Sequence, residues 1–203
     1  MKISEIDSLD RINDIVQIHK ATFPDFFLTS LGDGFLKRLY KGFARHPSSG
    51  LLVAVDENNE TLGFAAYSMD LSGFYRFLLT KSLVPFMWYA TNAFIKRPYI
   101  ILRLFRALTK PNESKRLESY VELSSIGVLP SAKNKGIGSA LIDTLKIKVN
   151  FNQYKYIELE TDAIGNDEVN NFYVKNQFNL YCTYKTAEGR YMNKYHYMRN
   201  SVH

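Results

Sequence analysis

The sequence predicts a mixed α/β fold in which helices cover a single sheet. Apolar residues recur at helical spacing in some segments and alternate with polar residues in others. The second half of the chain reads strand, helix, strand, which implies a parallel pair of strands joined by a right-handed crossover. The other strands read as hairpins, so we expect parallel and antiparallel neighbours in the same sheet.

The N-terminal half predicts two helices followed by a hairpin. Residues 8–23 repeat Ile and Val at near-helical spacing until Pro24 ends the pattern, and residues 31–43 place apolar side chains on one face. Residues 51–55 and 62–67 are short apolar runs separated by Asp-Glu-Asn-Asn, which is typical of two strands joined by a turn.

The C-terminal half predicts a strand, a helix, a strand, a second helix and a hairpin. The first strand covers residues 120–128 and its helix residues 138–149. Alternation around residues 157–160 predicts the next strand, and residues 167–176 predict a short helix. Residues 180–198, which are rich in tyrosine and broken by Glu-Gly, predict the final hairpin.

In the strand predicted at residues 120–128, the alternation of apolar and polar residues shifts by one position. Val121 and Leu123 share one parity, whereas Ile126 and Val128 share the other. Side chains alternate strictly along a regular strand, so one face cannot hold all four residues unless an extra residue is inserted. We therefore predict a β-bulge at Ser124-Ser125.

Length and composition favour one domain over residues 1–203, with an insertion at about residues 71–112. The chain has 203 residues, of which 46% are hydrophobic, enough to form a substantial core. The single cysteine, Cys182, excludes an internal disulfide framework and a cysteine-built zinc site. We expect no metal, because the four histidines lack ligand spacing. Residues 1–11 do not resemble a signal peptide, and we expect a cytoplasmic protein.

The insertion carries the basic character of the chain. Between residues 71 and 110 there are seven Lys or Arg and no Asp or Glu, whereas the whole chain has a net charge of +6. The rest is thus close to neutral, and overall charge does not predict a nucleic-acid partner. Three interpretations stay open: a helical hairpin packed on the sheet or a subunit partner, a lid favouring an acidic acceptor, and a helix on an anionic membrane surface.

A glycine-bearing basic turn between residues 128 and 140 predicts an anion site. It joins a strand to a helix, whose first turn has unpaired N–H groups and the positive end of the helix dipole. Gly136 and Gly138 let the backbone approach an anion, and Lys133 and Lys135 add charge. The turn is not a Walker loop, and the third glycine of the dinucleotide fingerprint is replaced by Leu141.

This turn resembles motif A of the GNAT superfamily, the GCN5-related N-acetyltransferases. The matching residues are Val128-x-Pro130 and Lys133-x-x-Gly136-x-Gly138, with Lys where Gln or Arg is usual. A second family motif is matched downstream, with Gln177 in place of a glycine; its residues are Asn166, Val169, Tyr173 and Phe178. Residues 23–40 also resemble members from bacterial surface-polysaccharide pathways, which favours an amino-sugar acceptor.

The resemblance implies a GNAT-like acyl-CoA N-acyltransferase fold with acetyl-CoA as cosubstrate. Ile126 and Val128 would pair with the pantetheine amides, the Val128 N–H would polarise the thioester carbonyl, and Asn166 would contact the CoA arm. Backbone N–H groups of the turn would hold the pyrophosphate; these residues are Lys133, Asn134, Lys135, Gly136, Ile137, Gly138 and Ser139.

The resemblance also implies two catalytic residues, each with a simpler alternative. Glu122 would take the proton of the attacking amine, directly or through an ordered water; the alternative is a surface glutamate on a strand. Tyr173 would protonate the leaving thiolate; the alternative is a core aromatic residue, and both roles are compatible.

We therefore predict an N-acetyltransferase that transfers the acetyl group of acetyl-CoA to a small-molecule amine, such as a nucleotide-linked amino sugar. The alternative is an inert binding module that uses the basic insertion to reach a membrane surface or nucleic acid. The C-terminal aromatic hairpin makes a homodimer plausible.

Overall fold

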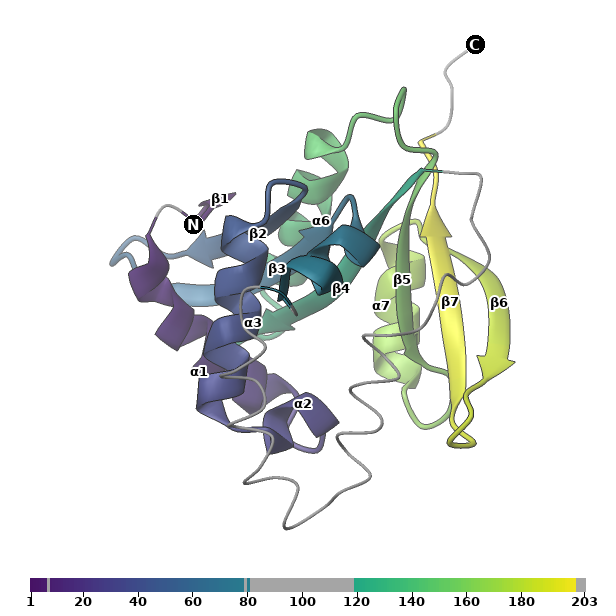
Figure 1. The fold of residues 1–203 in the computed structure, drawn as a ribbon, viewed down its shortest axis with the longest axis horizontal. Coiled ribbons are helices and arrows are strands. Elements are labelled where there is room, and N and C mark those ends of the chain that lie inside the picture. The colour runs from purple at the N-terminus through teal and green to yellow at the C-terminus, as the bar shows by residue number, and fades with distance from the viewer. Residues whose placement is uncertain (7, 79, 81–118, 200–203) are drawn as a thin grey trace.

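The structure is a computed structural model that describes residues 1–6, 8–78, 80 and 119–199. Within these residues the strands form one seven-stranded sheet in the order β1-β2-β3-β4-β5-β7-β6 (Figure 1). The β4–β5 pair is parallel and the other pairs are antiparallel. The predicted mixed α/β class and the parallel pair are confirmed. Residues 81–112 of the predicted insertion lie outside the described residues, whereas residues 71–78 are helical.

The elements follow the predicted order. The strands are β1 (Lys2–Glu5), β2 (Ser49–Val55), β3 (Thr61–Ser68), β4 (Tyr120–Val128), β5 (Tyr156–Asp162), β6 (Asn179–Lys185) and β7 (Tyr191–Tyr197). The labelled α-helices are α1 (Ile12–Thr22), α2 (Phe27–Ser30), α3 (Asp33–Arg45), α6 (Ile137–Lys148) and α7 (Asp167–Lys175). The sequence analysis missed β1 and α2, because four residues are too few to show a period.

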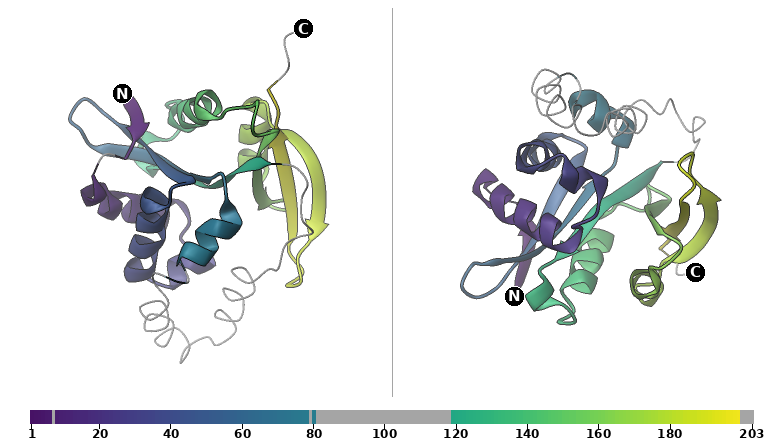
Figure 2. Two further views of the ribbon diagram at one scale, coloured as in Figure 1. Left: turned by 45° about the horizontal axis from the view of Figure 1, so that its top comes forward. Right: turned by 90° about the horizontal axis from the view of Figure 1, so that it is seen from below.

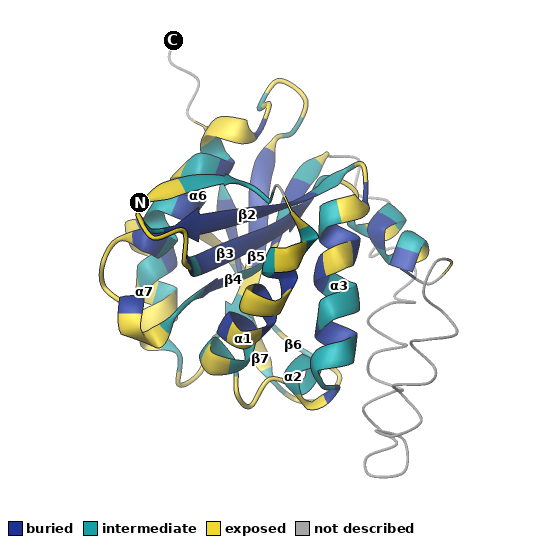
Figure 3. Cartoon of the chain, turned by 90° about the vertical axis from the view of Figure 1, so that its left-hand side faces the viewer, coloured by how far each residue is buried: buried dark blue, intermediate teal, exposed yellow. Residues whose placement is uncertain are grey.

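Helices cover both faces of the sheet and enclose two hydrophobic clusters. Helices α1 and α3 and the helical residues 71–78 lie on one face, and α6 and α7 lie on the other (Figure 2). Strands β2 and β3 lie between the two layers and are buried along nearly their whole length (Figure 3). Phe64 and Ala66 of β3 face the α1/α3 layer, while Ala65 and Tyr67 face the layer of α6.

The bulge in β4 is confirmed at Ser124. Ala66 of β3 is paired with Ser125, but the next residue of β3 is paired with Leu123, so Ser124 is the extra residue. The residues before and after the bulge consequently face the same layer: Val121 and Leu123 lie in the core under α6, and Ile126 and Val128 pack against it. The insertion of one residue is thus what keeps β4 apolar on a single face.

A buried polar chain connects α1 to this bulge through α3. His19 is 1% exposed, and its Nδ1 lies 2.6 Å from the Tyr40 hydroxyl, which in turn lies 3.4 Å from the Ser125 hydroxyl. The other ring nitrogen, Nε2, is buried with no hydrogen-bond partner among the described residues. Burial lowers the pKa of His19 to about 4, because the charged imidazolium is poorly solvated there.

We predict that His19 makes the folded state sensitive to acid. Its pKa rises from about 4 in the folded state to the ordinary 6.5 on unfolding, so the unfolded chain binds more protons between these values. Neutral His19 therefore contributes about 3 kcal/mol to the free energy of unfolding above pH 6.5, and this contribution is lost as the pH falls toward 4. Thermal unfolding of His19→Gln, followed from pH 7.5 to 4, should therefore show a weaker loss of stability with acid than the parent chain. The control is Tyr40→Phe, which removes the hydrogen bond but keeps the imidazole and its acid dependence. Equal slopes in His19→Gln and the parent would contradict the assignment.

Candidate active site

The turn before α6 is shaped as an anion site. Gly136 has left-handed backbone angles (φ 76°), and no side chain caps the helix. The first helical hydrogen bond runs from the Ala140 N–H to the Gly136 carbonyl oxygen at 3.0 Å. The N–H groups of Ile137, Gly138 and Ser139 therefore have no carbonyl acceptor within the helix and remain available to a ligand. Lys133 and Lys135 are exposed beside them.

Strand β4 leaves an open edge next to this turn. The parallel β4–β5 ladder has only three pairs, from Tyr120↔Tyr156 to Glu122↔Glu158. Beyond them, β5 continues alongside β7 and β4 continues alongside β3. The Leu129 N–H donates to the Leu62 carbonyl oxygen in β3 at 2.9 Å. Because N–H groups alternate sides along a strand, those of Ile126 and Val128 point away from β3, and we call these two groups the open edge of β4.

The open edge and the turn are continuous in the chain and fit an extended ligand that ends in a pyrophosphate. A pantetheine arm carries amides that can pair with the edge as an added strand would. The adjacent N–H groups at the start of α6 then fit the phosphates. The residues predicted to bind CoA thus occur where both kinds of donor are available.

Gly138 joins the turn to α7. A Cβ atom at this position would lie 3.0 Å from the Phe172 ring, which is closer than ordinary packing allows. The absence of a side chain at position 138 thus lets α7 pack closely against the start of α6. A bulky substitution here would displace α7, so its effect on ligand binding could not be assigned to the turn alone.

Helix α7 carries Tyr173 and begins beside Asn166. Tyr173 is buried against the rings of Phe172, Phe178 and Tyr195, so the predicted packing role is present. Within the described residues its hydroxyl has no hydrogen-bond partner. Burial raises the pKa of Tyr173 above its ordinary value, so the phenol stays protonated.

Asn166 and Val169, which were matched to the second family motif, lie at the start of α7. The Asn166 side chain donates to the Thr161 hydroxyl at 2.8 Å and to the Asp162 carbonyl oxygen at 3.3 Å, which fixes the loop after β5. Val169 is 36% exposed. The helix turns this residue to solvent because Phe172 and Tyr173 alone define its packed face.

Glu122 lies on the opposite face of the sheet, at the last pair before β4 and β5 separate. It is half-buried and is paired with Ser68 of β3 and Glu158 of β5. Tyr75, on the helical residues 71–78, lies close by. Burial, followed by the negative charges of Glu122 and Glu160, raises the pKa of the Tyr75 phenol, which places that ring in the field of both carboxylates.

A buried ionic cluster adjoins Glu122 and was missed in the sequence analysis. Glu158 is 2% exposed; the His196 ring nitrogen Nε2 lies 2.7 Å from it, and the Lys194 Nζ lies 3.3 Å from it. Lys194 also reaches Glu160 at 3.1 Å. The alternation of Glu158 and Glu160 with apolar neighbours indicated their shared face. The register that places Glu158 beside Glu122 is set by long-range pairing and could not be read from the sequence.

Asp162 and Cys182 lie in the C-terminal part of the sheet and have structural surroundings. Asp162 forms an ion pair with Arg190, whose Nη2 lies 2.7 Å from both carboxylate oxygens of Asp162. Cys182 is a free, half-buried cysteine in β6. No group of three or more potential metal ligands is found within the described residues. Among those residues no helix is long and apolar enough to cross a membrane.

Comparison with known proteins agrees with this geometry. The family description "Acetyltransferase (GNAT) family" matches residues 12–178. No curated protein matches the chain. The fold is similar to an aminoglycoside 6'-N-acetyltransferase complexed with coenzyme A, at 16% identity, TM-score 0.61, and coverage of 98% of this chain and 97% of that one.

Two further solved structures share the fold. One is the ribosomal-protein-alanine N-acetyltransferase from Brucella melitensis, at 14% identity and TM-score 0.63, covering 98% of this chain and 100% of that one. The other is Arabidopsis thaliana NAA60 in complex with acetyl-CoA, at 17% identity and TM-score 0.58, covering 98% of each chain. At these identities the likeness shows a common fold alone. The family match, which spans most of the chain, shows that this protein belongs to the GNAT family of acetyltransferases.

Proposed function

We propose that this chain is an acetyl-CoA-dependent N-acetyltransferase that acetylates a primary amine of a small molecule by direct attack in a ternary complex. The observation that carries the proposal is the continuity of the open edge of β4 with the N–H groups at the start of α6. Coenzyme A-containing structures among the fold neighbours support the same cosubstrate. The single cysteine is in keeping with a cytoplasmic setting.

The two proposed catalytic residues lie on opposite faces of the sheet. Glu122 faces the layer of α1 and α3, whereas Tyr173 lies in the core on the side of α6 and α7. An amine that approaches from the Glu122 side therefore meets the thioester at the point where β4 and β5 separate. The cosubstrate supplies an activated acetyl group whose thiol is the leaving group.

Proton transfer accompanies the formation of the new bond. Glu122 takes a proton from the alkylammonium, which is the form that dominates at neutral pH, and leaves a nucleophilic amine. The nitrogen then forms the C–N bond, the Val128 N–H stabilises the carbonyl oxygen, and the C–S bond breaks. The second proton lost by the nitrogen ends on the sulfur, so the products are an amide, a free thiol and one released proton.

Tyr173 donates a hydrogen bond from its hydroxyl group to the departing sulfur. Burial raises the pKa of the Tyr173 phenol above its ordinary value, so the hydroxyl stays protonated and able to donate. A hydrogen bond stabilises the negative charge that develops on the leaving group.

Cosubstrate binding can be tested by introducing a negative charge into the turn that precedes α6. Gly136→Asp introduces a carboxylate beside the proposed pyrophosphate, whereas Gly136→Asn has nearly the same shape and tolerates the left-handed conformation equally. Calorimetry should show the acetyl-CoA Kd rising at least tenfold in Gly136→Asp relative to Gly136→Asn, with the difference shrinking at high salt. Gly189→Asp places the same residue at another left-handed glycine, in the hairpin, and should leave the Kd unchanged. The absence of acetyl-CoA binding in the parent chain would refute the proposal, and binding without turnover of any amine would favour the inert module.

Removal of the Tyr173 hydroxyl should slow transfer without weakening cosubstrate binding. Tyr173→Phe keeps the buried ring and its contacts with Phe178 and Tyr195. We expect kcat to fall roughly 10- to 100-fold, since a hydrogen bond to a charged group contributes about 1.5–3 kcal/mol. The measurement is thiol release at saturating acetyl-CoA, with the Kd for acetyl-CoA as control. An unchanged kcat would leave Tyr173 with only its packing role.

Neutralising Glu122 should make the rate of acetyl transfer depend on how much of the acceptor amine is already deprotonated in solution. Glu122→Gln is expected to lower kcat/KM at pH 7 by about 100-fold, and the loss should shrink as the pH approaches the pKa of the amine. Glu57→Gln, in the exposed β2–β3 turn, serves as the matched control and should show the parent profile. Parallel pH profiles for Glu122→Gln and the parent would rule out the base role.

A further inference from the structure

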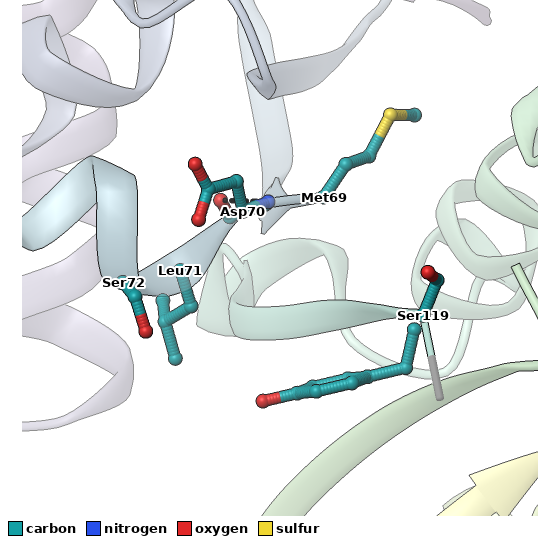
Figure 4. A pocket seen from close by; sticks show the side chains of 7 residues that line it. Met69, Asp70, Leu71, Ser72 and Ser119 are labelled. Carbon is teal, nitrogen blue, oxygen red and sulfur yellow. Dashed lines mark hydrogen bonds between the residues drawn. The ribbon is translucent and has the colours of Figure 1, made fainter. Parts of the chain in front are cut away.

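A small polar pocket opens on the Glu122 side of the sheet. Its volume is about 180 Å³, and its lining includes Ser68, Asp70, Leu71, Ser72, Ser119 and Tyr120. Figure 4 shows these side chains gathered from two places, the segment that follows β3 and the start of β4. The pocket therefore lies where the chain leaves one central strand and enters the next.

The register places this pocket next to the proposed base. Ser68 is the cross-strand partner of Glu122, and Tyr120 precedes Glu122 by two residues, so its side chain lies on the same face. The helical residues that begin at Leu71 also carry Tyr75, whose ring lies in the field of Glu122. Glu122 does not itself line the pocket, but its cross-strand partner Ser68 does, so the pocket adjoins the strand position of Glu122 on the same face of the sheet.

The lining offers a carboxylate and several hydroxyl groups. Asp70 is exposed, and its Oδ1 accepts a hydrogen bond from the Gly73 N–H at 2.8 Å, while Oδ2 has no partner among the described residues. Ser72 and Ser119 are exposed as well. These groups match an ammonium and hydroxyl substituents, while Met69, Leu71 and Tyr120 of the same lining offer apolar surface to the carbon atoms of the molecule.

The size of the pocket limits what it holds. Pockets that enclose drug-sized ligands start at about 300 Å³, and this one is clearly smaller. It accommodates a molecule with few non-hydrogen atoms, such as one hydroxylated ring or an amino alcohol. It does not enclose the first several residues of a peptide.

We propose that this pocket is the acceptor subsite of the same transfer, that it takes a small hydroxylated primary amine, and that Asp70 binds the amine or a hydroxyl beside it. The proposal rests on the proposed N-acetyltransferase function and names the substrate class for that site. It differs from the prediction of an acidic acceptor, because the described lining includes a carboxylate and no Lys or Arg.

Asp70→Asn is the sharpest variant for this test. Asn is as good a helix cap as Asp, so the contact with the Gly73 N–H can be retained while the negative charge is removed. The matched control is Asp56→Asn. Asp56 similarly accepts backbone N–H groups in an exposed turn, from Asn58 at 2.9 Å and Glu60 at 2.8 Å, but lies in the β2–β3 turn and does not line the pocket. Ser72→Trp adds a second approach, since it fills the pocket from an exposed helical position.

The experiment compares glucosamine, butylamine and a tripeptide with a free N-terminus. Each is titrated into the CoA-saturated protein and tested for thiol release with acetyl-CoA. We expect glucosamine to bind and react better than the other two. Asp70→Asn should raise its KM about tenfold with little change in kcat, and Ser72→Trp should abolish its binding, while both variants keep the parent Kd for acetyl-CoA.

The outcomes separate this proposal from the function on which it rests. Loss of acetyl-CoA binding in the parent chain overturns both. If acetyl-CoA binds, three results overturn the subsite proposal alone. These are that none of the three amines binds, that the tripeptide or butylamine is preferred, or that Asp70→Asn behaves as Asp56→Asn does. A selective rise in KM for glucosamine cannot come from a merely structural role of Asp70, because a disturbed helix start would also alter stability and kcat.

Discussion

The extra residue at Ser124 is the constraint on which the site depends. An uninterrupted β4 would either turn its apolar side chains away from α6 or continue to pair with β5. Because the bulge bends the strand and shifts its phase, Ile126 and Val128 can pack on the α6 layer while their N–H groups point to the open edge. Unpaired N–H groups inside a sheet are costly unless water or a ligand takes them, which is why the open edge indicates a binding function.

The separation of β4 and β5 also gives the sheet two chemically different sides at one point. The side of α6 and α7 is apolar around Tyr173 and has the anion-binding turn at its margin. The other side carries carboxylates from both parallel strands, of which Glu158 is fixed by His196 and Lys194. Removing one partner of such a buried pair is costly, because it leaves an uncompensated charge in the protein interior.

The sequence predicted the parts that depend on local pattern. Periodicity located most elements to within a few residues, and the parity change from Leu123 to Ile126 predicted the bulge before any pairing was known. The uncapped turn before α6 was predictable because the glycine pattern at positions 136 and 138 is a local signal. The pairing of Glu122 with Glu158, the proximity of Tyr75 and the pocket beside Asp70 were not predictable in this way. Each depends on the register between distant segments, for which a single sequence carries no local signal.

The contact between Gly138 and Phe172 ties two parts of the site together. A methyl group at position 138 would lie 3.0 Å from the Phe172 ring, so the ring or α7 would have to move by a few tenths of an ångström to admit it. Among homologues, the identities of these two positions should therefore covary, with a smaller ring or an aliphatic residue at 172 wherever the glycine at 138 is replaced by alanine. The residue allowed at position 138 is thus set by the packing of the neighbouring helix as well as by the ligand.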